Sequence, residues 1–220
     1  MLRGRARLPV LAEIEGPPEG ARAWSLRRGD FASLEGVVPQ LAERRVLLVA
    51  GEGEAPAVVA IALAVAAAAS GRRTLLIDCD LAHPRLAAHL GLASSPGVHE
   101  YLRWEAEPAD VLQPVALAGP ATSSSEPLVC VCGGRPATKA ETLLGLQSFS
   151  HMVGKLRAAY ELVLVVSPPV ASEPAAALAV ARQAEAVVAG LPADGSVRSV
   201  QAAIRRLPAP ALGAIELSAQ

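Results

Sequence analysis

The sequence has few cysteines, few aromatic residues and almost no net charge. Its 220 residues include three cysteines, too few for the disulfide framework of a small secreted protein. Aromatic residues make up 3% of the chain, so its core has to be built from aliphatic side chains. The formal net charge is −1, which excludes a large basic field for holding nucleic acid. These counts favour a reduced, cytoplasmic protein without a nucleic-acid partner.

Segments suited to a membrane or to secretion are also missing. The most hydrophobic stretch, residues 55–70, is shorter than the about 20 apolar residues that span a bilayer, and alanine drives insertion poorly. The basic residues before Pro9 are not followed by the apolar stretch of a signal peptide. We therefore expect a chain that meets a membrane only through a partner protein.

Hydrophobic residues are abundant and lie in short runs. They make up 52% of the chain, and the mean hydropathy of +0.36 excludes an intrinsically disordered protein. Continuous apolar runs are typical of strands covered on both faces, and longer stretches between them indicate helices. This alternation predicts an α/β fold, with a doubly wound, mainly parallel sheet and helices on both faces. The expected strands are residues 46–50, 74–78, 128–132, 162–166, 186–189 and 211–217, and the expected helices are 57–69, 141–159, 174–183 and 196–206.

The first part of the chain differs from the rest in composition. Residues 1–44 are rich in proline, glycine and arginine, which indicates an N-terminal arm or linker. Within it, residues 8–14 fit a short strand or an extended segment, and residues 30–42 fit a broken helix. Residues 45–220 are then expected to form the single α/β domain.

The turn after the first strand of this domain is arranged like a phosphate-binding loop. A strand, a glycine-bearing turn and a helix follow one another, and the N–H groups at a helix start favour phosphate. A working loop also needs a lysine for the β- and γ-phosphates and a serine or threonine for Mg²⁺. The only lysines are Lys139 and Lys155, far from this turn. We interpret it as a degenerate phosphate loop, made of Gly51, Glu52, Gly53, Glu54, Ala55, Pro56 and Ala57.

Two carboxylates, Asp78 and Asp80, follow the second strand of the domain. Ligands of such sheets bind beyond the carboxyl ends of the strands, so this pair would hold Mg²⁺ if a magnesium nucleotide were bound. The alternative is a solvated turn in which Asp80 caps the next segment. A third strand end, residues 166–169, has no carboxylate.

Taken in order, these segments resemble the cytoplasmic domain of bacterial tyrosine kinases of capsule and exopolysaccharide synthesis, which are related to septum-site and partition ATPases. The resemblance implies a P-loop nucleoside-triphosphatase fold for most of the chain. Where the family has its loop lysine, its loop hydroxyl, the arginine of its acidic motif and the aspartate of its third motif, this sequence has Pro56, Ala57, Ala82 and Val166. The tyrosine cluster that ends the family's sequences is missing too.

These departures favour a pseudoenzyme, a kinase-like module with no cofactor that regulates or scaffolds polysaccharide export. Its expected partners are a membrane polysaccharide co-polymerase or an active kinase homologue, and it could also assemble as a homo-oligomer. The alternative is an active Mg-ATP-dependent tyrosine kinase or ATPase that uses Asp78 and Asp80, with a lysine from a neighbouring subunit. A lesser alternative is a dinucleotide-binding domain, suggested by Gly51 and Gly53 after a strand and by Asp78 after the next.

Cys130 and Cys132 are the remaining candidate ligands. We expect their side chains to point to opposite faces of the strand that contains them, which would prevent the two thiols from sharing a metal ion. The four histidines have no zinc-like spacing to any cysteine.

Overall fold

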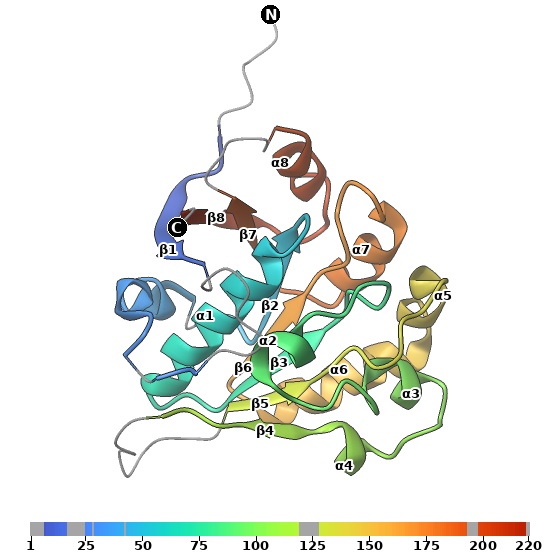
Figure 1. The fold of residues 1–220 in the computed structure, drawn as a ribbon. Coiled ribbons are helices and arrows are strands. Elements are labelled where there is room, and N and C mark those ends of the chain that lie inside the picture. Colours follow the sequence, from blue (N-terminus) through green and yellow to red (C-terminus); the bar gives the residue numbers. More distant parts are fainter. Residues whose placement is uncertain are drawn as a thin grey trace, which may run out of the picture.

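One eight-stranded sheet runs through the part of the chain that the structure describes, residues 7–16, 25–27, 29–41, 43–118, 128–192 and 198–218 of a computed structural model. The strand order is β1-β8-β7-β2-β6-β3-β5-β4, and every pairing is parallel except that of β4 with β5 (Figure 1). The fold class predicted from the sequence is therefore confirmed. The strands are β1 (Val10–Glu15), β2 (Val46–Gly51), β3 (Thr74–Asp78), β4 (Gln113–Val115), β5 (Leu128–Val131), β6 (Leu162–Val166), β7 (Ala186–Pro192) and β8 (Ala211–Ser218).

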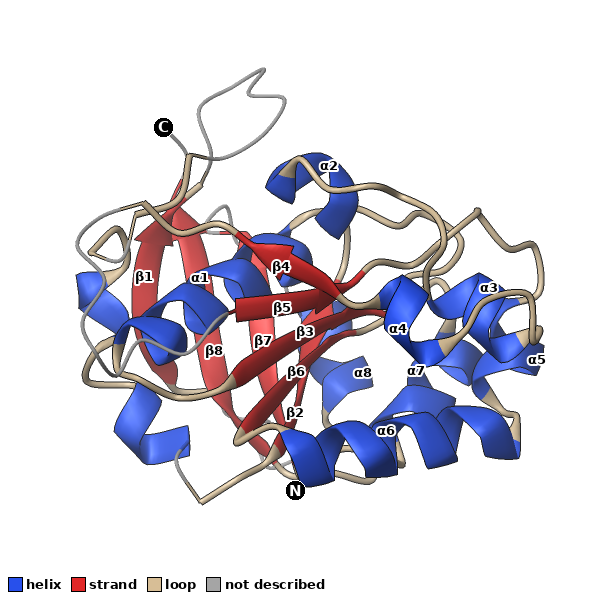
Figure 2. Ribbon diagram, turned by 90° about the horizontal axis from the view of Figure 1, so that it is seen from below, coloured by secondary structure: helices blue, strands red, loops and turns tan. Residues whose placement is uncertain are grey.

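Helices cover the two faces of this sheet, as Figure 2 shows. The long apolar helix α1 packs on one face, and α6, α7 and α8 pack on the other. Shorter helices lie in the connections at the ends of the strands. The helices are α1 (Ala55–Ala69), α2 (Leu86–Leu90), α3 (Val98–Leu102), α4 (Pro108–Val111), α5 (Ala140–Leu144), α6 (Gln147–Ala159), α7 (Pro174–Ala181) and α8 (Arg198–Ile204).

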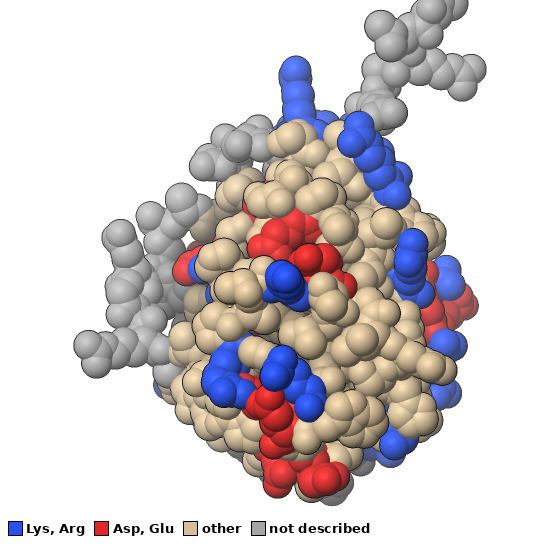
Figure 3. Space-filling view, turned by 90° about the vertical axis from the view of Figure 1, so that its right-hand side faces the viewer, with Lys and Arg blue, Asp and Glu red and all other residues tan. Residues whose placement is uncertain are grey.

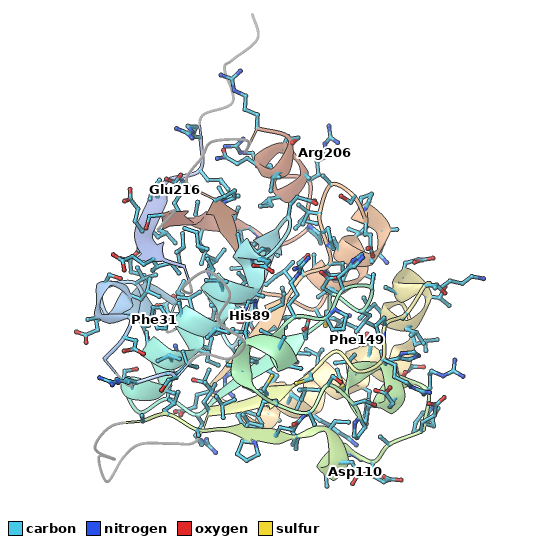
Figure 4. All side chains as sticks on the ribbon, in the orientation of Figure 1. Phe31, His89, Asp110, Phe149, Arg206 and Glu216 are labelled. Carbon is cyan, nitrogen blue, oxygen red and sulfur yellow. The ribbon has the colours of Figure 1, made fainter. Side chains whose placement is uncertain are left out.

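The apolar composition of strand β2 follows from its position inside the molecule. Because successive side chains of a strand point to opposite faces, Leu48 enters the core that contains Phe149, whereas Leu47 and Val49 enter the core beneath α1. Both faces of the strand are buried, so polar side chains are excluded from it. Figure 4 places Phe149 inside the molecule, while Arg206, two residues after α8, and Asp110 on α4 lie at opposite ends of it.

Helix α1 is buried on nearly all sides, and its composition allows this. Its sequence contains only alanine, valine, leucine, isoleucine and one proline, so no polar side chain has to be solvated. Small alanine side chains let the helix lie close to the sheet and to the short 3-10 helices η1 (Ala32–Leu34) and η2 (Val38–Leu41). No helix among the described residues is long and apolar enough to cross a membrane.

The two elements expected before residue 45 are present. The short strand is β1, an edge strand of the same sheet as the rest of the chain, and the broken helix is the pair η1 and η2.

Two local features differ from the sequence-based expectations. The expected helix at residues 141–159 is two helices, because Leu146 between them has an extended backbone. Strand β4 was not expected; it is three residues long and contains Pro114, which an edge strand tolerates.

Candidate functional site

The carboxyl ends of β2, β3 and β6 meet at one place, as the sequence analysis expected of its three strand ends. Strand β6 lies between the other two, and its Val166 is in register with Val49 of β2 and Asp78 of β3. The space at this point amounts to about 240 Å³ and is too narrow throughout for the centre of a water molecule. It is lined by Gly51, Gly53, Pro56, Ala57, Asp78, Asp80, Arg85, Val166, Ser167 and Pro169.

The loop between β2 and α1 makes a tight turn that depends on its two glycines. Gly53 has a φ of +65°, a conformation that glycine adopts without steric cost. Gly51 lies so close to β7 that a Cβ atom there would be 2.3 Å from the carbonyl oxygen of Gly190. Helix α1 begins at Ala55, and Pro56 in its first turn needs no hydrogen-bond acceptor for its nitrogen.

Both glutamates of this loop already interact with groups of the chain. The Glu52 carboxylate accepts hydrogen bonds from the backbone N–H of Ala171 at 2.6 Å and from the Ser172 hydroxyl at 3.0 Å, which ties the loop to the connection after β6. The Glu54 carboxylate accepts a hydrogen bond from the Arg85 guanidinium at 3.1 Å. The donors and the cation next to the loop are therefore engaged by carboxylates of the protein itself.

Asp78 is completely buried, and its carboxylate is surrounded by backbone donors. One oxygen accepts hydrogen bonds from the N–H groups of Arg85 at 2.8 Å and Leu86 at 2.9 Å, and the other accepts from Asp80 at 3.2 Å. Burial raises the pKa of Asp78 to about 6, although these hydrogen bonds favour the charged form. Asp78 thus holds the turn after β3 against the start of α2.

Asp80 is also buried, with 4% of its surface exposed, but it lies at the outer end of the same turn. Its Oδ1 accepts a hydrogen bond from the backbone N–H of His83 at 3.1 Å. Burial raises the pKa of Asp80, and the neighbouring carboxylate of Glu173 raises it further. The two aspartates that the sequence analysis treated as a pair therefore have different surroundings.

Arg85 is the site residue that the sequence analysis missed. It lies seven residues beyond Asp78, yet its side chain lines the space at the phosphate loop, where the sequence analysis expected no cation. Its Nε atom is buried and has no hydrogen-bond partner within the described part of the chain. The sequence signal was an arginine shortly after a strand-end aspartate, but only the fold brings it to the loop.

The prediction for the two cysteines was wrong. Cys130 and Cys132 lie in the same core, beneath α1, and their sulfur atoms are 3.9 Å apart. The reason is the period of an extended chain, in which residues two positions apart point to the same face. Both thiols are free and buried, and burial contributes to the raised pKa of Cys130, after its hydrogen bond with Cys132.

Acidic and basic side chains gather on the face where these strands end. Figure 3 shows one group of carboxylates in the upper part of this face and a second group, mixed with basic side chains, in the lower part. Glu52, Glu54, Asp80 and Glu173 belong to the connections that follow β2, β3 and β6. The edge of the sheet at which a triphosphate would be expected is thus rich in negative charge.

Comparisons with known proteins identify solved structures that have a similar fold. No protein-family model matches the sequence, and no curated protein matches it either. The kinase domain of the Escherichia coli tyrosine kinase ETK matches with a TM-score of 0.76 and 18% identity, over 96% of this chain and 90% of that one. The BceF tyrosine kinase domain matches with a TM-score of 0.74 and 22% identity, over 96% and 93%.

A septum-site protein has a more distant form of the same fold. The MinD protein of Pyrococcus horikoshii, solved with Mg-ADP, matches with a TM-score of 0.60 and 18% identity, over 78% of this chain and 68% of that one. This chain therefore has the fold that bacterial tyrosine kinase domains share with P-loop ATPases of the septum-site type.

Proposed function

We propose that this chain is a catalytically degenerate, tyrosine-kinase-like module that acts through protein partners in exopolysaccharide or capsule export. The observation that carries the proposal is the phosphate loop, whose side chains supply negative charge where a triphosphate would need positive charge. Glu52 and Glu54 stand in the loop, and Pro56 and Ala57 stand where a lysine and a hydroxyl would be needed.

Electrostatics argue against phosphoryl transfer at this loop. Catalysis of that reaction depends on cations that neutralise the charge on the transferred phosphoryl group. Among the described residues that line the space, Arg85 carries the only positive side chain, and it is paired with Glu54. A bound triphosphate would have to compete with that carboxylate for the one available cation.

The carboxylates that would bind magnesium are also reduced in number and availability. The third strand end supplies the apolar Val166, next to Asp78 in the sheet. The carboxylate of Asp78 is completely buried and already accepts three backbone N–H hydrogen bonds, so it offers little free acceptor capacity to a magnesium ion. Asp80 remains, and one carboxylate is a poor magnesium site by itself.

The partner proposal follows from the retained fold. A scaffold kept with its catalytic groups replaced fits a role in which its surface is recognised, and the similar tyrosine kinase domains indicate the process. We expect a membrane polysaccharide co-polymerase or an active kinase homologue as the partner. A second copy of this chain is a further candidate.

One observation favours the alternative of an active kinase or ATPase. The buried Nε of Arg85 has no partner among the described residues and lies beside the loop, so it could bind an anion if the Arg85 side chain turned to open this narrow space. Arg85 would then replace part of the charge of the missing lysine, with Asp78 and Asp80 on the metal side.

Titration calorimetry with Mg·ATP and Mg·ADP distinguishes the two readings. For the wild-type chain we expect no binding up to about 1 mM nucleotide. The MinD protein of Pyrococcus horikoshii serves as the positive control, since it has been solved with Mg-ADP. Micromolar, magnesium-dependent binding that is lost in Arg85→Gln, together with incorporation of labelled phosphate, would refute the proposal.

A further inference from the structure

Three potential metal ligands come together beside the phosphate loop, on residues distant in sequence. Asp80 and His83 lie in the connection after β3, and Glu173 lies directly before α7. One donor atom of each residue lies within 4.8 Å of the other two. The parallel sheet makes this possible, because it brings the ends of β3 and β6 side by side.

The cluster has a buried base and an open outer side. The Asp80 side chain is 6% exposed and the His83 side chain is 67% exposed, and their Oδ1 and Nδ1 atoms are 4.0 Å apart. The backbone N–H of His83 binds Asp80 Oδ1, which fixes the direction of that carboxylate. The hydrogen bonds of the described residues do not include one to Asp80 Oδ2, so this second oxygen is available to an ion.

The ligand types indicate which ion would bind. Mg²⁺ and Ca²⁺ prefer oxygen ligands alone, whereas an imidazole together with carboxylates suits Zn²⁺ and its neighbours in the first transition row. A dication would also offset the repulsion between the carboxylates of Asp80 and Glu173, which lie close together. We propose that Asp80, His83 and Glu173 form a binding site for a divalent transition-metal ion, with Zn²⁺ as the representative case.

The geometry needs a small adjustment to receive the ion. Bonds of about 2.0–2.2 Å in a tetrahedral site place ligand atoms roughly 3.4 Å apart, about 1 Å closer than in this structure. His83, whose ring is mostly exposed, and Glu173, which is partly exposed, supply this movement toward the buried Asp80. Three protein ligands leave a fourth position for water or for a group of a partner protein.

The site does not depend on the proposed function. None of its three residues belongs to the phosphate loop. A histidine and two carboxylates would hold the ion, and no bound nucleotide is needed. A bound ion would join the connection after β3 to the start of α7. It would therefore stabilise the surface at the strand ends whether or not that surface binds a nucleotide.

The test measures metal binding to the untagged full chain. Calorimetry with Zn²⁺ and absorption spectroscopy with Co²⁺ are carried out on the wild type, on His83→Ala and on Glu173→Gln. We expect a wild-type dissociation constant at or below about 10 μM, visible Co²⁺ bands, and at least about tenfold weaker binding in each variant. His151→Ala is the matched control, because His151 is exposed on α6 and outside the cluster, and it should bind like the wild type.

Two results would overturn the proposal. One is the absence of Zn²⁺ binding by the wild type, and the other is equal binding by the wild type and His83→Ala. Thermal unfolding without metal shows whether each variant is folded, and added Zn²⁺ should raise the unfolding temperature of the wild type but not of His83→Ala. Nucleotide binding is measured separately, so failure of this site and failure of the proposed function remain distinguishable.

Discussion

The charge state of Asp78 should control how the stability of the protein changes with pH. Two effects act on this carboxylate in opposite directions. Complete burial disfavours its charge, whereas three backbone N–H groups favour it. Burial prevails, and the pKa in the folded protein is raised from 3.8 to about 6. Between about pH 4 and pH 6, the folded state therefore holds a proton that the unfolded chain has already released.

The size and sign of the effect follow from this difference in pKa. Each unit corresponds to about 1.4 kcal/mol, so raising the pKa from 3.8 to about 6 is worth about 3 kcal/mol of stability. Because the folded pKa is the higher one, this contribution is complete below about pH 4. It is lost as the pH rises to about 6, and above that the free energy of unfolding no longer depends on Asp78.

Urea unfolding of the wild type and Asp78→Asn at pH 4, 5, 6 and 7 measures this term. Asparagine keeps one hydrogen-bond acceptor but cannot ionise, so lost hydrogen bonds shift the variant equally at every pH. The wild-type free energy of unfolding, minus that of the variant, should fall by about 2 kcal/mol between pH 4 and pH 7. Asp80 titrates in both proteins and largely cancels. A difference that stays constant would show that the three N–H groups balance burial, and one that rises with pH would show that they outweigh it; either result refutes the reasoning.

Three further substitutions test the packing of two glycines and the charge of a buried glutamate. Gly51→Ala should lower the free energy of unfolding by about 1–3 kcal/mol, because the added Cβ would overlap a backbone oxygen of β7. Gly154→Ala, in a position of α6 with open space around it, should raise that free energy by about 0.5–1 kcal/mol; equal effects in urea unfolding would contradict this reasoning. Burial alone would raise the pKa of Glu100, but hydrogen bonds from Arg135 and Gly97 lower it to about 2. Glu100→Ala should therefore lower the free energy of unfolding by about 3 kcal/mol at pH 7, and by less below pH 4. A loss that is the same at both pH values would argue against an ionised Glu100.

The strands and the long helices could be predicted because their sequences leave little choice. A run such as residues 46–50 has no polar side chain to expose, so it becomes an interior strand, and its glycine turn and Pro56 fix the start of α1. The break between α5 and α6 and the edge strand β4 escaped prediction. Both are decided by how the chain packs on its neighbours rather than by the local pattern.

The cysteine error has a different origin. The pattern Cys130-x-Cys132 was sufficient to place both thiols on one face, since side chains in a strand repeat every two residues. The structure agrees with what this rule alone predicts. What sequence could not provide is the separation of the sulfur atoms, 3.9 Å, which depends on their rotamers in the core beneath α1.

The position of the candidate site was determined by sequence, and the behaviour of its side chains by tertiary structure. A parallel sheet must bring the ends of β2, β3 and β6 to one edge, so the loop at Gly51 and the aspartate Asp78 had to meet there. Which backbone N–H groups bind Asp78, how Arg85 reaches Glu54, and that Glu173 approaches Asp80 depend on three connections folded against one another. Such contacts join residues up to about a hundred positions apart, and no local periodicity encodes distances of that kind.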